Sequence, residues 1–374
     1  MKILHLASFS GNHGDLVNHD GFKQWFNKRI LEKKEWHQIE IREIFRKNKS
    51  FQKHVLDVAN EYDLVIIGGG NYFETWPTDT WSGTSLDLTP KSFRGIRTPF
   101  FFNALGVDSG QGISKNAQMH FREMIDAINS REDNILSVRN DGSEEQLLQL
   151  NALADYFWVP DGGFYIETGE FAVQEPKNLV INVASDMPNI RFNSNKGDSI
   201  EFARRMANYI TKIHKIVGFK KIIFTQHVIG DLGLINTIIS MIDEKIRREI
   251  IEVSSYGMKK SNFDEIISIY KSASLIIAQR FHANIVAMRL EKPVIGLSNY
   301  PQISNLYKEL DSSNYCVQLE SNDDVDRLVE LSKIAISEPD TYTKKLRSNL
   351  KVMYDKGYQS HNQIANSLKK SLEV

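Results

Sequence analysis

Residues 275–296 read LIIAQRFHANIVAMRLEKPVIG. Two short apolar runs, 275–278 and 293–296, flank a helical pattern over residues 283–290. A strand, a helix and a second strand in this order are typical of a parallel sheet covered by helices. This stretch therefore predicts an α/β fold.

The same alternation continues in both directions along the chain of 374 residues. In the first half, apolar runs predict strands at residues 3–9, 39–44, 64–67, 99–105, 135–138 and 157–159, and helical patterns lie at 21–33, 116–129 and 143–150. In the second half, strands are predicted at 179–183, 221–225, 250–253, 275–278, 293–296 and 315–318, with helices such as 200–217 and 263–271 between them.

The apolar periodicity breaks at residues 167–177, which contain Gly169 and Pro176. We predict two doubly wound, Rossmann-type domains over residues 1–168 and 177–338, followed by a C-terminal helical segment at 339–374. Ligands of such sheets bind beyond the carboxyl ends of the strands. The functional site is therefore expected in a cleft between the two domains.

Composition excludes several classes of protein. Lys and Arg total 46 against 47 Asp and Glu, and this balance argues against a nucleic-acid binder. The single cysteine, Cys316, cannot form an internal disulfide, which predicts a reducing compartment. No apolar run approaches the roughly 20 residues of a membrane span, and the apolar start at residues 1–8 is too short for a signal peptide. We expect a cytoplasmic protein.

The helical pattern at residues 340–372 has more basic than acidic side chains. Two interpretations remain open for it. It is either a solvated helix face, or a patch that contacts the inner face of a membrane or an acidic partner.

Two glycine-rich segments follow predicted strands of the first half. In GNHGD at 11–15, Gly14 permits close approach of a ligand, and Asp15 is either a general base or a helix cap. In the glycine run at 68–70, Gly69 and Gly70 expose backbone amides to a ligand, although close packing explains the run equally well. The run matches neither a dinucleotide-binding loop nor a P-loop.

The segment SVRNDGS at 137–143 also follows a strand. Ser137 and Arg139 are candidate substrate-binding residues, because a guanidinium at a strand end can hold two oxygens of a carboxylate or phosphate. Ser143, with Glu and Gln residues behind it, is interpreted as a helix cap.

Arg280 and His282 form the most specific pair in the chain. Both lie where a strand ends and a helix begins, so a positive charge, an imidazole and free helix amides come together there. Such a site binds anions and can transfer a proton near neutral pH. The next strand ends at Ser298, which is expected beside this pair and is assigned to the same anion site.

Taken together and in order, these motifs resemble the polysaccharide pyruvyltransferase family. The resemblance rests on GNHGD at 11–15, IIGGGNYF at 66–73, SVRNDGS at 137–143 and RFHANIVAMRLEKPVIGLSNYP at 280–301. VPDGGF at 159–164 places Asp161 at a fifth family position.

The resemblance implies a GT-B-like pair of domains and transfer of pyruvate from phosphoenolpyruvate onto two hydroxyls of a sugar, giving a cyclic ketal. The acceptor would be a cell-surface polysaccharide or its lipid-linked precursor, and no metal or nicotinamide cofactor is implied. Carried onto this chain, Arg139 and Arg280 would hold the carboxylate and phosphate of the donor. His282 would act as the acid and Asp15 as the base.

One position departs from the family. A lysine is common where this chain has Gln302, which supplies a hydrogen bond but no positive charge. Either another cation takes its place in donor binding, or the donor differs.

Two other functions remain open, and two tryptophans are candidates for contact with the acceptor. The scaffold also suits a glycosyltransferase that uses a nucleotide sugar, or a non-catalytic glycan-binding protein. Trp76 and Trp81 belong to the long loop before the strand at 99–105, where they could stack on a sugar or pack on their own domain. The sequence assigns no acceptor sugar and no oligomeric state.

Overall fold

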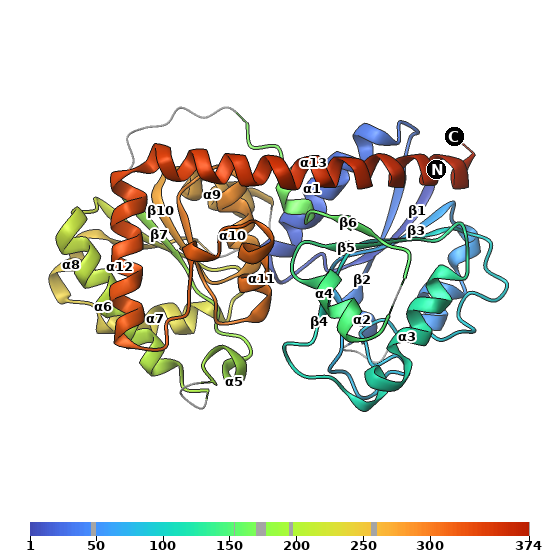
Figure 1. Cartoon of the computed structure of the whole chain (residues 1–374), viewed down its shortest axis with the longest axis horizontal. Coiled ribbons are helices and arrows are strands. Elements are labelled where there is room, and N and C mark those ends of the chain that lie inside the picture. Colours follow the sequence, from blue (N-terminus) through green and yellow to red (C-terminus); the bar gives the residue numbers. More distant parts are fainter. Residues whose placement is uncertain (46–49, 153, 170–176, 194–196, 256–259, 374) are drawn as a thin grey trace. The chain divides into compact units, whose positions relative to one another are not determined.

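The computed structural model describes residues 1–45, 50–152, 154–169, 177–193, 197–255 and 260–373. The chain forms two compact units (Figure 1). The first unit contains Met1–Ser10, His19–Gly162 and Val352–Val374, and the second contains Gly11–Asn18 and Gly163–Lys351.

A parallel sheet of six strands forms the core of the first unit, in the order β2-β1-β3-β4-β5-β6. The strands are β1 (Lys2–Ala7), β2 (Glu35–Glu40), β3 (Leu64–Glu74), β4 (Phe100–Asp108), β5 (Ile135–Arg139) and β6 (Phe157–Val159). Apart from β2, most of their side chains are buried, as expected for strands with helices on both faces.

The helices of this region are α1 (His13–Arg29), α2 (Ile41–Phe45), α3 (Lys115–Asn129) and α4 (Ser143–Gln149), with short turns η1 (Gln52–Leu56), η2 (Ala59–Glu61) and η3 (Gly162–Tyr165). The side chain of Ser114 caps α3 by accepting a hydrogen bond from the amide of Ala117. α3 then buries Phe121, Met124 and Ile125, an apolar face at helical spacing.

The second unit contains another parallel sheet, in the order β12-β11-β10-β7-β8-β9. Its strands are β7 (Asn178–Asn182), β8 (Lys221–Thr225), β9 (Ile251–Val253), β10 (Ala273–Ala278), β11 (Val294–Leu297) and β12 (Cys316–Val317). Counted within the unit, this is the doubly wound order 3-2-1-4-5-6 of Rossmann folds, read from the opposite edge.

The connecting helices are α5 (Pro188–Arg191), α6 (Ser199–Val217), α7 (Asp231–Met241), α8 (Glu244–Ile250), α9 (Lys260–Lys271), α10 (Phe281–Arg289), α11 (Pro301–Glu309), the turn η5 (Ser313–Tyr315), α12 (Asn322–Ser337) and α13 (Pro339–Leu372). Asp198 caps the start of α6, and Gly218 ends it in the left-handed conformation. The predicted α/β class with two parallel, helix-covered sheets is confirmed.

Two local predictions for the first unit were wrong. The strand predicted at 39–44 is β2 at Glu35–Glu40, and Ile41 and Ile44 belong to α2. β2 is an edge strand with largely exposed side chains, so it lacks an apolar run, whereas the two isoleucines are buried at helical spacing. The helix predicted at 21–33 begins earlier, at His13, because its first turns are polar yet helical.

The division into units differs from the predicted ranges at three places, the first being residues 163–168, which group with the second unit. Residues Gly11–Asn18 group with the second unit, although they follow the first strand. The final helix α13 is continuous, but its residues from Val352 onward group with the first unit.

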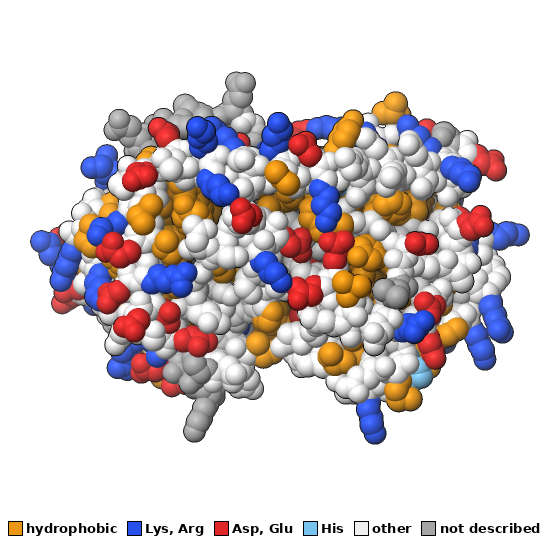
Figure 2. Space-filling model, in the orientation of Figure 1, with side chains coloured by type: hydrophobic (Ala, Val, Ile, Leu, Met, Phe, Trp, Pro, Cys, Tyr) orange, Lys and Arg blue, Asp and Glu red, His pale blue; other side chains and the backbone are white. Residues whose placement is uncertain are grey.

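No helix in the described ranges combines the length and apolar character that crossing a bilayer requires. On the face drawn in Figure 2, Lys and Arg side chains are interspersed with Asp and Glu. That face has no continuous basic area.

Candidate active site

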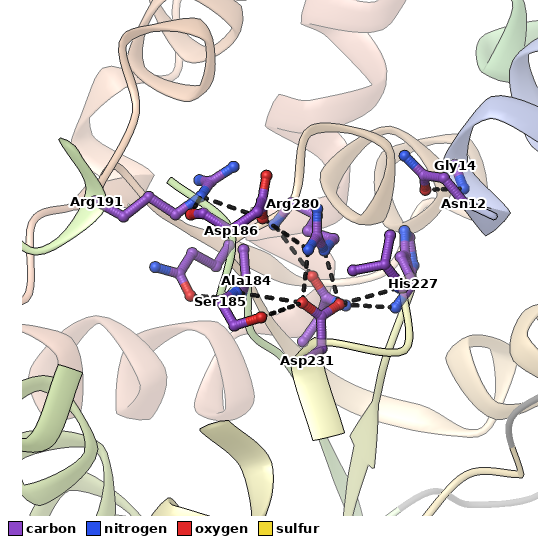
Figure 3. Close-up of polar contacts among 12 residues, drawn as sticks. Asn12, Gly14, Ala184, Ser185, Asp186, Arg191, His227, Asp231 and Arg280 are labelled. Atoms are coloured by element: carbon purple, nitrogen blue, oxygen red, sulfur yellow. Dashed lines mark hydrogen bonds and ion pairs between the residues drawn. The ribbon is translucent and has the colours of Figure 1, made fainter. Parts of the chain in front are cut away.

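The carboxyl ends of three neighbouring strands in the second unit, β10, β7 and β8, deliver most of the polar side chains labelled in Figure 3. Asp186 follows β7, Asp231 follows β8 at the start of α7, and Arg280 follows β10 directly before α10. β7 and β10 are adjacent, and the winding of the sheet reverses between them. Doubly wound sheets bind their ligands at this reversal point.

Arg280 and Asp231 form a bidentate ion pair at this point. Nε of Arg280 donates to Oδ2 of Asp231 at 2.8 Å, and Nη2 donates to Oδ1 at 2.5 Å. Asp231 is fully buried and also accepts hydrogen bonds from the amides of His227, Val228 and Ser185 at 3.1–3.2 Å. Burial opposes the charge of Arg280, but Asp231 and Asp186 outweigh it and raise the pKa of Arg280.

Asp186 lies between two guanidiniums. Its Oδ1 accepts from Nη2 of Arg280 at 2.8 Å and lies 3.5 Å from Nε of Arg191, which also donates to the carbonyl of Asp186 at 3.0 Å. Partial burial would raise the pKa of Asp186, yet Arg280 and Arg191 lower it below its ordinary value. The carboxylate of Asp186 is thus ionised and shared.

His282 is the second residue of α10 and is 9% exposed. It packs against Gly14, where a Cβ would lie 2.5 Å from Nδ1 of the imidazole. Asn12 caps the start of α1 by accepting a hydrogen bond from the amide of Gly14 at 2.9 Å. The structure therefore brings the GNHGD segment and the Arg280–His282 pair together within the second unit.

Asp15 was predicted as a base or a cap. Asn12 provides the side-chain cap that the structure shows, and Asp15 lies in the first turn of α1. Its role as a base stays a prediction.

Two further histidines line the same region. The amide of His13 donates to the carbonyl of His227 at 3.0 Å, and the two imidazole centroids are 6.5 Å apart. Burial, followed by the positive charge of Arg280, holds the pKa of His227 well below its ordinary value. His227 is therefore neutral and cannot offset the anions that surround Arg280.

Arg139 lies in a separate cluster of the first unit, at the carboxyl ends of β3 to β6. Its Nε donates to Asp141 at 2.7 Å, its Nη1 to Asp161 at 3.3 Å, and its Nη2 to Asn71. Burial opposes the charge of the guanidinium, but Asp141 and Asp161 raise its pKa. Gly106 leaves room for this cluster, because a Cβ there would collide with Asn71 and lie 2.8 Å from Nη2 of Arg139. Donor binding by Arg139 stays a prediction.

Two serines of the SVRNDGS segment have structural partners. Ser137 donates to the carbonyl of Phe102 at 3.1 Å and accepts from the amide of Ala104 at 2.8 Å, which satisfies the irregular pairing of β4 with β5. Ser143 does not cap α4, because Gly142 holds the cap position in the left-handed conformation. The hydroxyl of Ser143 instead accepts from the amide of Val107 at 2.8 Å and bonds to Asp141.

Gly69 and Gly70 lie inside β3, which continues through the glycine run to Glu74. Gly70 pairs with Leu105 of β4, so these glycines belong to the sheet rather than to a loop after it. Gly68 has φ +126°, and a Cβ there would overlap the carbonyl of Asn103. Close packing therefore explains at least this glycine.

Ser298 and Gln302 lie at the end of β11 and the start of α11. β11 pairs with β10, as predicted, so their loop neighbours the one that contains Arg280. The amide of Ser298 donates to the carbonyl of Val317 at 2.8 Å. Gln302 is the second residue of α11, directly after Pro301.

Trp76 and Trp81 contact residues of their own unit. Trp76 meets Phe45 edge-on at 5.8 Å between ring centroids, and Trp81 stacks on His120 at 4.2 Å. These contacts are the packing alternative that the sequence left open, and stacking on a sugar stays a prediction.

Sequence reasoning missed Asp186, Arg191, His227 and Asp231. Each follows a correctly predicted strand, β7 or β8, and this position was the only available signal. Among the described residues, no group of three or more His, Cys, Asp and Glu side chains is arranged to hold a metal ion.

Residues 5–300 match the family described as polysaccharide pyruvyl transferase. The chain belongs to this family. It is therefore a transferase of the polysaccharide pyruvyl transferase type. The matched residues include both the Arg139 cluster and the Arg280 site. No curated protein matches the chain in sequence.

Several solved structures share the fold at low identity. MnaA of S. aureus, solved with UDP, is 12% identical, with a TM-score of 0.58 over 100% of this chain and 97% of that chain. HepE of Anabaena, solved with UDP and glucose, is 12% identical, with a TM-score of 0.57 over 99% and 100%. UDP-GlcNAc 2-epimerase of Methanocaldococcus jannaschii is 13% identical, with a TM-score of 0.51 over 90% and 93%. With the two six-stranded sheets, these likenesses show a GT-B-like fold.

Proposed function

We propose that this family member transfers pyruvate from phosphoenolpyruvate onto two hydroxyls of one sugar and releases phosphate. The observation that supports this most directly is the Arg280–His282 pair at the reversal point of the second sheet. There a guanidinium fixed by Asp231 and an imidazole packed on Gly14 lie two residues apart. A compact, doubly anionic donor needs a fixed cation and a nearby proton donor.

In the proposed reaction, Arg280 binds an oxyanion of phosphoenolpyruvate. Asp231 takes Nε and Nη2 in a bidentate pair, so the guanidinium plane is fixed before the donor arrives. Because Asp231 is buried and held by backbone amides, it holds the guanidinium of Arg280 in place and offsets the cost of burying its charge. A fixed cation stabilises negative charge on the departing phosphate.

His282 supplies the proton in this scheme. One sugar hydroxyl adds to C2 of the enol, while the methylene carbon C3 takes a proton from the imidazole and becomes a methyl group. The second hydroxyl then displaces phosphate from C2, which closes the ketal. The proton of the first hydroxyl restores the imidazole, and the proton of the second leaves with phosphate, so atoms and charges balance.

For the acceptor we propose Asn71 and Asp108, at the partly exposed margin of the Arg139 cluster in the first unit. Asp108 and Asn71, linked by a hydrogen bond of 3.0 Å, are partly exposed beside the buried Arg139, Asp141 and Asp161. Carboxylate and amide oxygens accept hydrogen bonds from sugar hydroxyls. The acceptor would be a cell-envelope sugar or oligosaccharide, either free or lipid-linked, and the enzyme would work in the cytoplasm at the inner face of the membrane.

Calorimetry with phosphoenolpyruvate and a panel of nucleotide sugars tests the donor. We expect the wild-type protein to bind phosphoenolpyruvate, Arg280→Lys to bind it about tenfold more weakly, and His282→Gln to bind it normally. In turnover assays that follow phosphate release, His282→Gln should lower kcat with little change in KM. Arg289→Gln is the matched control, because Arg289 is a part-buried arginine at the far end of the same helix.

Binding of a nucleotide sugar without phosphoenolpyruvate would overturn this proposal in favour of a glycosyltransferase. Binding of neither donor, together with affinity for an oligosaccharide, would favour a non-catalytic glycan-binding protein.

A further inference from the structure

Arg191 has a buried guanidinium nitrogen, Nη1, for which the described residues offer no hydrogen-bond acceptor. The residue is 6% exposed, and among the described residues no partner lies within hydrogen-bond distance of its Nη1. Nε is used, because it donates to the carbonyl of Asp186 at 3.0 Å. Buried N–H groups are almost always paired in native proteins, and a charged one without an acceptor is costly. Because the described residues offer Nη1 no acceptor, a bound anion can supply one.

The position of Arg191 is set by loops from both neighbours of β10. It lies at the end of α5, after β7, and its guanidinium carbon lies 5.3 Å from the ring centroid of Tyr300, after β11. The side chain of Asn299 also donates to the carbonyl of Arg191 at 3.0 Å. Because the sheet order is β11-β10-β7, these contacts connect the loops on either side of β10, the strand that leads to Arg280.

Asp186 and Asp231 neutralise the two guanidiniums unequally. Asp231 is fully buried and commits both oxygens to Arg280. Asp186 is shared between Arg280 and Arg191, and its side chain is 42% exposed. Asp186 is thus the carboxylate that an incoming anion can replace. Its side chain can rotate into solvent and stay hydrated, whereas the buried side chain of Asp231 cannot.

We propose that Arg191 is a second guanidinium of the donor site, which binds an oxyanion of the donor through Nη1 beside Arg280. This inference rests on the proposed function for the identity of the donor. Asp186 then acts as a competing counter-ion. It holds both guanidiniums in place before the donor binds, and the donor anion displaces it from them. Arg191 also supplies a positive charge next to Tyr300, two residues before Gln302.

Binding of phosphoenolpyruvate and of inorganic phosphate to Arg191→Gln tests this role by calorimetry. Hydrogen bonds to charged groups predict a Kd about 10- to 100-fold higher than that of the wild type. Arg289→Gln is the control, because Nε of Arg289 likewise donates to a backbone carbonyl, that of Ile166 at 3.1 Å. Its Kd should equal that of the wild type.

Asp186→Asn gives an expectation of opposite sign. Removing the competing charge should lower the Kd for phosphoenolpyruvate severalfold, whereas a purely structural role for Asp186 and Arg191 predicts weaker or unchanged binding. This variant and Arg191→Lys keep the test decisive if Arg191→Gln does not fold. Wild-type affinity in Arg191→Gln, or loss of affinity in a folded Asp186→Asn, would overturn the inference.

The two proposals fail in different ways. If the wild type binds phosphate but not phosphoenolpyruvate, and Arg191→Gln loses phosphate binding, the anion site stands and the donor assignment fails. If the wild type binds phosphoenolpyruvate and Arg191→Gln binds it equally well, the donor stands and the role of Arg191 fails. Binding of neither anion by the wild type overturns both.

Discussion

At Gly14 the backbone of α1 lies so close to the imidazole of His282 that no side chain fits between them. We expect Gly14→Ala to move the imidazole, because a Cβ would lie 2.5 Å from Nδ1 and 2.8 Å from the Cβ of His282. A displacement of about 1 Å at a reacting group costs on the order of 100-fold in rate. Turnover should fall by this order, as measured by phosphate release.

Gly233→Ala is the matched control for that variant. Gly233 lies in α7 of the same unit, and a Cβ there would meet nothing within 4 Å. Its turnover should equal that of the wild type. Equal turnover in Gly14→Ala would show that the placement of His282 does not limit the reaction.

Asp231 is the fully buried counter-ion of Arg280. Among the described residues, Asp231→Ala would leave the buried guanidinium with the partly exposed Asp186 as its one counter-ion. Breaking a buried ion pair costs about 3–5 kcal/mol of the free energy of unfolding. Urea unfolding of the variant measures this loss.

A surface ion pair provides the comparison. Lys212 and Asp326 also approach to 2.5 Å, but their side chains are 41% and 64% exposed. Asp326→Ala should therefore cost less than about 1 kcal/mol. Similar losses in the two variants would contradict the structural role given to Asp231.

The sequence identified site residues only where a local pattern marks them. Arg280 and His282 stand at a strand–helix junction, which is visible in the sequence itself. Asp231 and Arg191 have no such pattern. Asp231 pairs with Arg280, 49 residues further along the chain, and Arg191 is held by Asn299, in the loop after another strand. Ser143 was misassigned as a cap because glycine in the left-handed conformation can hold that position without a side-chain hydrogen bond.

Among the helices, α13 ends in a segment that covers the first unit. His361 packs on Trp25 of α1 at 4.5 Å between ring centroids, and Arg29 of α1 donates to Asn362 at 2.7 Å. Burial, with a smaller contribution from Arg29, lowers the pKa of His361 to about 3. In the unfolded chain the same histidine titrates near 6.5.

This difference makes the stability of the first unit depend on pH. Between about pH 6.5 and 3 the unfolded chain binds one more proton at His361, so the free energy of unfolding falls as the pH falls, by at most about 1.4 kcal/mol per pH unit. His361→Gln should show a shallower decrease between pH 7 and 5 in urea unfolding followed by tryptophan fluorescence. His54→Gln, at an exposed site, should decrease as steeply as the wild type. A slope that His361→Gln leaves unchanged would refute the assignment.

Elements were predicted well where burial is continuous along the sequence. β1, β4 and β10 are apolar runs buried on both faces, which only a covered parallel strand requires. β2 was misplaced because an edge strand can be polar. The start of α1 was missed because its polar first turns, which look like a solvated loop in the sequence, belong to the second unit. Contacts with residues distant in the sequence decide both elements, and such contacts leave no pattern in the local sequence.

For the whole molecule, the segment Val352–Val374 is part of the first unit, although the second unit separates it from the rest. A chain that ends at Lys351 would lose Ile364 and Leu368, which are 0% and 1% exposed. Burial of two such side chains contributes about 3–6 kcal/mol. Hydrogen exchange should show that the strands of the first unit lose protection, while those of the second unit retain it.

Two single substitutions in the full chain check that result. Ile364→Asp should reproduce the loss of protection, because it buries a charge. Val352→Asp should not, since Val352 is 69% exposed. Equal loss of protection in both units of the shortened chain would show instead that they unfold together.

The chain passes from one unit to the other after Ser10, Asn18, Gly162 and Lys351. On the ribosome, domains commonly fold in the order in which they are made. Here the first unit cannot be completed in that order, because its final helical segment is translated after every residue of the second. The first sheet is synthesised before Ile364 and Leu368. The apolar surface that buries these two side chains therefore stays exposed while the 189 residues from Gly163 to Lys351 are synthesised. Completion of the first unit therefore follows synthesis of the second, and we expect the first unit to depend on chaperones during that interval.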